Sequence, residues 1–200
     1  MANTHFSGPV LFSAARPTLE NLNIGTWPDQ TRFMDDFTGI LLDATNDWTV
    51  VKDSGASAAL QADALNGVVD LTSAATTDND GCSIQGNEIW GLPSTAGQRL
   101  YFEARFQMSD VDQMDMFIGV CENFATNPEA IFTASNRIGF QIDDGDATPH
   151  LITESSDSET DTTLSGTTYD LSDATDVTVS FVATKGTTTD KVKFYINRTL

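Results

Sequence analysis

The sequence has few cations and no long apolar run. Lys and Arg number 10 against 29 Asp and Glu in 200 residues, which gives a formal charge of −19. Phosphate backbones and anionic lipid headgroups repel such a charge, so we expect neither nucleic acid nor a membrane as partner. No apolar stretch approaches the length that spans a bilayer. The opening residues also lack the basic and apolar regions of a secretory signal.

Cysteine is nearly absent as well. Cys82 and Cys121 are the only two, which is too few for a disulfide framework. Cys121 ends the apolar run "MFIGVC", where a free thiol behaves as a small buried hydrophobe. Nothing in the sequence places a base beside either cysteine, so we do not expect a nucleophile. One bridge between the two is the alternative to a pair of free thiols.

Residues 1–35 lack any regular period. Prolines and glycines interrupt them, and their large apolar residues recur at neither helical nor strand spacing. Ordering such a segment alone costs backbone entropy with little burial in return. We therefore expect an extended N-terminal arm that becomes ordered on a neighbouring subunit, a flexible tail being the alternative. The residues predicted to anchor it are Phe6, Val10, Leu11, Phe12, Leu22, Ile24 and Trp27.

From residue 36 onward the chain has the pattern of short β-strands separated by turns. In residues 99–109, Leu100, Phe102 and Ala104 share one face while polar side chains share the other. Period two with one polar face indicates antiparallel sheets that are half buried and half solvated. We predict an all-β domain over 36–200, a two-sheet jelly-roll-like sandwich. Its expected strands are 47–53, 58–62, 67–74, 82–88, 99–109, 114–122, 136–144, 149–156, 176–185 and 190–200.

Three segments carry further predictions. Residues 154–176 carry almost no large apolar side chains, so we predict a solvated excursion at the edge of the sandwich. Pro128 allows only a short helical turn in "NFATNPEAIFTAS". The last strand, 190–200, is expected to lie at a sheet edge, the alternative being that residues following Leu200 are absent from this sequence.

Acidic loops raise the question of a metal. Calcium takes six to eight oxygen ligands, and paired aspartates on a tight loop supply several of them. The calcium candidates are Asp78, Asp80, Asp143, Asp144 and Asp146. None lies in the full helix–loop–helix calcium spacing, and Asp-Gly is common in ordinary β-turns. We favour turn formation, and we expect no metal and no cofactor.

The sequence offers no catalytic constellation. Two carboxylates flanking a scissile bond would suit glycoside hydrolysis. The acids on and beside the predicted strands fit equally well as surface and turn residues: Glu103, Asp110, Asp112, Asp115 and Glu122. The only histidines, His5 and His150, are isolated. We therefore predict that the chain is not an enzyme and has no catalytic residues.

Three tryptophans are candidates for binding. Trp48 leads into an apolar strand and is expected in the core. Trp90 lies in the Gly/Pro-rich "NEIWGLPSTAG" and is the best candidate for stacking on a glycan. Trp27 belongs to the predicted arm.

The strand succession resembles a known superfamily. "YFEARFQMSD", "DMFIGVCE", "RIGFQID" and "DKVKFYIN" resemble strands of the concanavalin A-like lectin and glucanase sandwiches, over roughly residues 36–200. Laminarinase-type enzymes of that superfamily carry a Glu–apolar–Asp–x–x–Glu catalytic strand. This sequence has no such strand, so the resemblance implies the fold and argues against a glycosidase.

The opening "MANTHFSGPV" resembles the start of virion structural proteins of tailed bacteriophages, marine ones in particular. This resemblance implies a capsid decoration (cement) protein on the virion surface, made in the host cytoplasm. Its implied partners are the major capsid protein and copies of itself, a trimer suiting a threefold site. The alternative is a carbohydrate-binding, lectin-like module of the virion or tail, and a glycan-cleaving enzyme of the same fold comes third.

Overall fold

The computed structural model describes most of the chain after residue 34. The described residues are 35–39, 42–44, 47–62, 64, 67–74, 81–86, 94–124, 127–156, 158–164, 169–197 and 199. The fold described below belongs to one unit, Phe37–Leu200. The predicted arm residues lie outside the described residues, and so do Trp90, Asp78 and Asp80.

Within the described residues the chain forms strands and a single 3-10 helix, so the all-β prediction is confirmed. All the strand pairs are antiparallel. The strands are β1 Trp48–Lys52, β2 Ser57–Leu60, β3 Val69–Thr72, β4 Cys82–Gly86, β5 Arg99–Phe106, β6 Met116–Cys121, β7 Asn136–Asp143, β8 Asp146–Ser155, β9 Ser158–Thr163, β10 Val177–Thr184 and β11 Lys191–Ile196.

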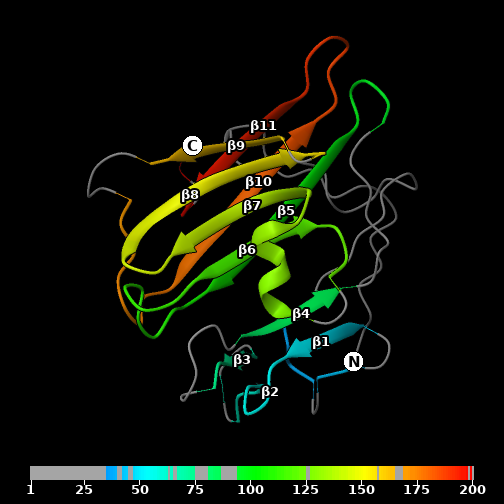
Figure 1. Cartoon of the computed structure of the whole chain (residues 1–200). Coiled ribbons are helices and arrows are strands. Elements are labelled where there is room, and N and C mark those ends of the chain that lie inside the picture. Colours follow the sequence, from blue (N-terminus) through cyan, green and yellow to red (C-terminus); the bar gives the residue numbers. More distant parts are fainter. Residues whose placement is uncertain are drawn as a thin grey trace, which may run out of the picture. The chain divides into compact units, whose positions relative to one another are not determined.

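Two larger sheets dominate the unit (Figure 1). One has the strand order β6-β7-β8-β9 and the other the order β11-β10-β5. Strands β10 and β11 form a hairpin, whereas β5 joins β10 from more than seventy residues earlier in the chain. The four-stranded sheet grows by successive hairpins. Both orders leave β9 and β11 at sheet edges, as we predicted for the last strand.

The two larger sheets share one hydrophobic core. Leu100, Phe140 and Phe181 are buried in it, and Phe181 is 0% exposed. The Phe102 ring stacks on Phe181 with centroids 5.3 Å apart, and Phe194 meets Phe140 edge-on at 5.2 Å. Burying one such ring contributes about 2–3 kcal/mol. The period-two pattern of β5, β7 and β10 therefore produces a sandwich-like packing of two sheets.

A short 3-10 helix, Pro128–Thr133 (η2), covers part of the outer face of the four-stranded sheet. Asn127 caps it by accepting a hydrogen bond from the Glu129 backbone N–H. Ile131 and Phe124 pack against Phe117 of β6. The prediction of a short helical turn at Pro128 is confirmed.

Two small sheets complete the unit. Strand β1 pairs with β4, and β2 pairs with β3. Gln85 of β4 ties the first of these to residues beside η2, because its amide both donates to and accepts from the Phe124 backbone. Trp48 is half-buried and lies outside the buried core clusters, so the expectation that it lies in the core is wrong. Its ring packs near that of Phe37, with the two centroids 5.6 Å apart.

Two expectations need correction. Residues 154–176 are not one solvated excursion, because Ser158–Thr163 forms β9 and pairs with β8. The second is that the polar face of each strand is solvated, which does not hold throughout β10. Ser180 lies on that face and is 1% exposed, and its hydroxyl has no hydrogen-bond partner in the described part of the chain.

Candidate functional site

The outer face of the four-stranded sheet carries a cluster of charged side chains around Arg137. Strand β7 places Ile138, Phe140 and Ile142 in the core, so period two turns Arg137 and Gln141 to the other side. Register then aligns Arg137 with Glu154 of β8, and Glu154 with Glu159 of β9. Three adjacent strands therefore bring one cation and two carboxylates together.

Arg137 is buried, and all three of its guanidinium nitrogens have partners. Its Nε donates to Glu154 Oε2 at 2.7 Å, and its Nη2 pairs with Glu159 Oε2. Its Nη1 donates to the Ile131 carbonyl at 3.2 Å and to Gln141 Oε1 at 2.9 Å. A buried guanidinium requires this saturation, since an unpaired one would cost several kcal/mol. Arg137 therefore locks η2, β8 and β9 to β7.

An aromatic ring lies beneath this guanidinium. The Arg137 Cζ atom is 5.9 Å from the centroid of the Phe117 ring on β6. Gly139 makes room for the ring, because a Cβ added there would lie 2.7 Å from Phe117 Cζ. A glycine, an aromatic residue and an arginine on neighbouring strands thus form one packed unit.

A second group of charged side chains surrounds His150, which lies on β8 four residues before Glu154. Its Nδ1 lies 3.0 Å from Asp161 Oδ2 on β9, and its Nε2 lies 3.8 Å from carboxylate oxygens of both Asp143 and Asp146. Burial opposes the charging of His150. The hydrogen bond and charge of Asp161, aided by Asp143 and Asp146, outweigh it and raise the pKa of His150 above 6.5.

The predicted calcium residues divide between described and undescribed parts. Asp143 accepts a hydrogen bond from Gln141, and Asp146 accepts one from the Thr148 backbone, which lowers the pKa of Asp146. The Asp144 backbone N–H bonds to Asp115. Among the described residues, no three His, Cys, Asp or Glu side chains converge as a metal site. Asp146 accepts from the backbone two residues further on, which is the hydrogen bond of an Asx turn.

The acids weighed as glycosidase candidates have structural partners. Glu122 accepts from the Ser135 backbone and from the Asn136 side chain, and Asp110 accepts from the Asp112 backbone. Glu103 accepts a hydrogen bond of 2.6 Å from the Tyr101 hydroxyl. The contacts of Glu122 and Asp110 hold the chain at turns and strand ends, whereas the Glu103 contact lies within β5.

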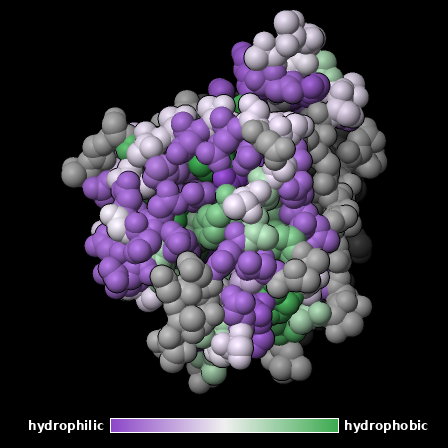
Figure 2. All heavy atoms as spheres, in the orientation of Figure 1, coloured by the Kyte–Doolittle hydropathy of each residue, from purple (hydrophilic) through white to green (hydrophobic). Residues whose placement is uncertain are grey.

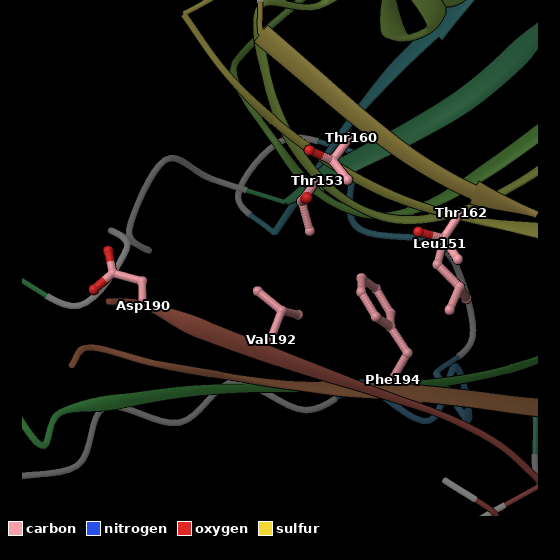
Figure 3. A pocket seen from close by; sticks show the side chains of 7 residues that line it. All are labelled: Leu151, Thr153, Thr160, Thr162, Asp190, Val192 and Phe194. Carbon is pink, nitrogen blue, oxygen red and sulfur yellow. The ribbon is translucent and has the colours of Figure 1, made fainter. Parts of the chain in front are cut away.

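A cleft of about 430 Å³ opens between the edges of the two larger sheets (Figure 3). Leu151 and Thr153 of β8, with Thr160 and Thr162 of β9, line one wall. Asp190, Val192 and Phe194 line the opposite wall, at β11. The cleft exists because the inward side chains of β9 are threonines, which are too short to fill the space above β11.

Both cysteines are free, so the alternative of a bridge between them is wrong. Burial, with the charge of Glu122, raises the pKa of Cys121 to about 11. Burial also raises the pKa of Cys82. A thiol at such a pKa is a poor nucleophile at neutral pH.

Sequence reasoning missed the cluster around Arg137. The available signal was a single cation in the otherwise apolar strand "RIGFQI", where an arginine must have partners. Its partners could not be named, because Glu154 and Glu159 lie 17 and 22 residues further on.

Comparisons with protein-family models, curated proteins and solved structures find no match to this chain. In the part of the chain that the structure describes, no helix is long and apolar enough to cross a membrane.

Proposed function

We propose that the chain is a non-enzymatic structural protein of a virion, a capsid decoration protein whose sandwich sits on the outer surface of the shell. The observation that carries this proposal is that the charged side chains of the four-stranded sheet pair with one another. Arg137, Glu154 and Glu159 saturate one another, and His150 is engaged by Asp161. Such pairing favours a rigid, load-resisting sandwich over a reaction centre, which needs groups available to a substrate.

The opening residues are the reason for placing the protein on a capsid. "MANTHFSGPV" resembles the start of tailed-phage virion proteins, and seven large apolar residues between Phe6 and Trp27 suit pockets on a capsid. Many copies, each bound weakly at lattice-related positions, stabilise a shell collectively. The acidic surface keeps particles apart in solution. Within this proposal the sandwich has the concanavalin A-like, jelly-roll arrangement that the strand succession resembles.

Binding to stripped capsids tests the proposal. Capsids of the virus that encodes the chain are freed of decoration and mixed with the full chain or with a form lacking residues 1–30. We expect only the full chain to co-sediment. Equal binding by both forms would contradict the anchoring role of the opening segment, and binding by neither would contradict the capsid proposal itself.

A carbohydrate-binding function is the second proposal, and the cleft between β9 and β11 favours it. Threonine hydroxyls and the Asp190 carboxylate can hydrogen-bond sugar hydroxyls, while the Phe194 ring offers an apolar surface. Glycan arrays with the full chain and with Thr160→Val/Thr162→Val test this function. Selective binding that the double variant loses supports it, and absence of selective binding by the full chain contradicts it.

A further inference from the structure

Three exposed cations gather on the outer face of the three-stranded sheet. Strands β5 and β11 direct Leu100, Val192 and Phe194 toward the core, so the intervening positions point outward. Register aligns Thr184 of β10 with Arg99 on one side and with Lys191 on the other. Lys193 follows two positions after Lys191. We call Arg99, Lys191 and Lys193 the basic patch.

Among the described residues, the basic patch has no ion-pair partner. All three side chains are exposed, and none has an ion pair in the described part of the chain. Neighbouring strands lie about 4.8 Å apart, so the Cα atoms of Arg99 and Lys191 are separated by about 10 Å. Three cations this close are unusual in a chain that holds only 10 Lys and Arg.

The rest of this sheet face adds little negative charge. Glu103 is the only carboxylate on the outward positions of its three strands. Arg105, further along β5, pairs with Asp176, and both side chains are more than half exposed. This face is therefore positive while the whole chain carries a formal charge of −19.

The four-stranded sheet offers the opposite charge. We call Asp143, Asp146, Glu159 and Asp161 the acidic rim; their side chains are 38–46% exposed. Among the described residues, only Arg137 and His150 pair with carboxylates of the rim, and Arg137 also pairs with Glu154. Figure 2, which views this molecule as Figure 1 does, shows hydrophilic side chains over β8 and β9.

We propose that the basic patch of one copy binds the acidic rim of a second copy. The patch and the rim lie on the outer faces of two different sheets that pack against each other through their inner faces, so one chain cannot join its own pair. Because the patch and the rim lie on opposite outer faces, two copies cannot form both patch–rim contacts with each other, so the contact is heterologous. Heterologous contacts continue from copy to copy, as a closed ring or as an open filament. This inference rests on charge and register and does not depend on the virion proposal.

The net charge sets an unusual salt dependence for this contact. Whole molecules of like charge repel over a Debye length of about 30 Å at 10 mM salt, which falls to about 8 Å at 150 mM. Charges in direct contact are screened less. Association should therefore strengthen from 10 to 150 mM salt and weaken again near 1 M, where the Debye length is about 3 Å.

Sedimentation velocity of the full chain over a range of concentrations tests the proposal. We expect concentration-dependent association that Lys193→Glu weakens by about tenfold or more. Lys52→Glu is the matched control, because Lys52 is an exposed strand lysine of the β1-β4 sheet and has the same charge change. If Lys52→Glu weakens association as much as Lys193→Glu, net charge and not the patch is responsible, and the proposal falls.

Two complementary variants give the decisive result. K191E/K193E keeps the acidic rim intact and leaves only Arg99 of the basic patch, whereas D143N/D146N/D161N keeps the basic patch intact and leaves only Glu159 of the rim; circular dichroism verifies their folds. Each alone should remain monomeric, while an equimolar mixture should form a complex that stops at a dimer. A wild-type chain that stays monomeric at every concentration and salt overturns the proposal, as does a mixture that fails to pair. Retention on immobilised heparin by such a monomer would assign the patch to an anionic polymer instead.

Discussion

Replacing Arg137 tests how the outer strands are held. Arg137→Met keeps most of the side-chain volume but removes the cation that pairs with Glu154, whose side chain is 12% exposed. A carboxylate left buried without its partner costs about 3–5 kcal/mol. Glu159 is 38% exposed and should add less than about 1 kcal/mol. We expect Arg137→Met to lower the free energy of unfolding by about 4 kcal/mol.

Urea unfolding, followed by tryptophan fluorescence, measures this loss, and thermal unfolding should show a melting temperature lowered by about 10 °C. Glu159→Gln is the control and should cost less than about 1 kcal/mol. The double variant R137M/E154L should recover most of the loss, because an apolar pair leaves no buried charge. A cost below about 1 kcal/mol for Arg137→Met, or a double variant less stable than the single one, would refute the reasoning.

Three further predictions follow from single residues. Ser180→Ala should raise the free energy of unfolding by about 1 kcal/mol because it removes a buried hydroxyl that has no partner among the described residues; a less stable variant in urea would contradict this. The pKa of His150 is raised on folding, so its contribution is full below pH 6.5 and is lost as pH rises through the folded value. Stability should therefore fall over that window, and His150→Gln should flatten the slope; an unchanged slope would count against the contacts with Asp161. Half-buried Cys121, with its pKa raised to about 11, should react slowly with iodoacetamide in the native protein and faster after denaturation, and fast native labelling would contradict the raised pKa.

The strands with apolar alternation could be predicted from the sequence because burial itself determines that pattern. The strand predicted at residues 176–185 matches β10 to within one residue at each end, because Val177, Val179 and Phe181 must share the core face. Strand β9 could not be predicted in this way. Its sequence "SETDTT" has no apolar residue, so it depends on backbone pairing with β8 and on ion pairs with Arg137 and His150.

The candidate sites were less accessible to sequence reasoning than the strands. The basic patch depends on register: Arg99 and Lys191 are far apart in the chain, and only β10 brings them together. The acidic rim was not predicted; two of its residues, Asp143 and Asp146, were considered only as calcium candidates. Their neighbour His150 looked isolated in sequence, since Asp161 reaches it through the β8-β9 pairing.

The central claim is that the chain decorates the outside of a capsid. Cryo-electron microscopy of purified virions, with and without the gene for this chain, tests it most directly. The account predicts density for a β-sandwich at symmetry-related positions on the outer surface, absent from particles that lack the gene. Identical shells in the two preparations would contradict it.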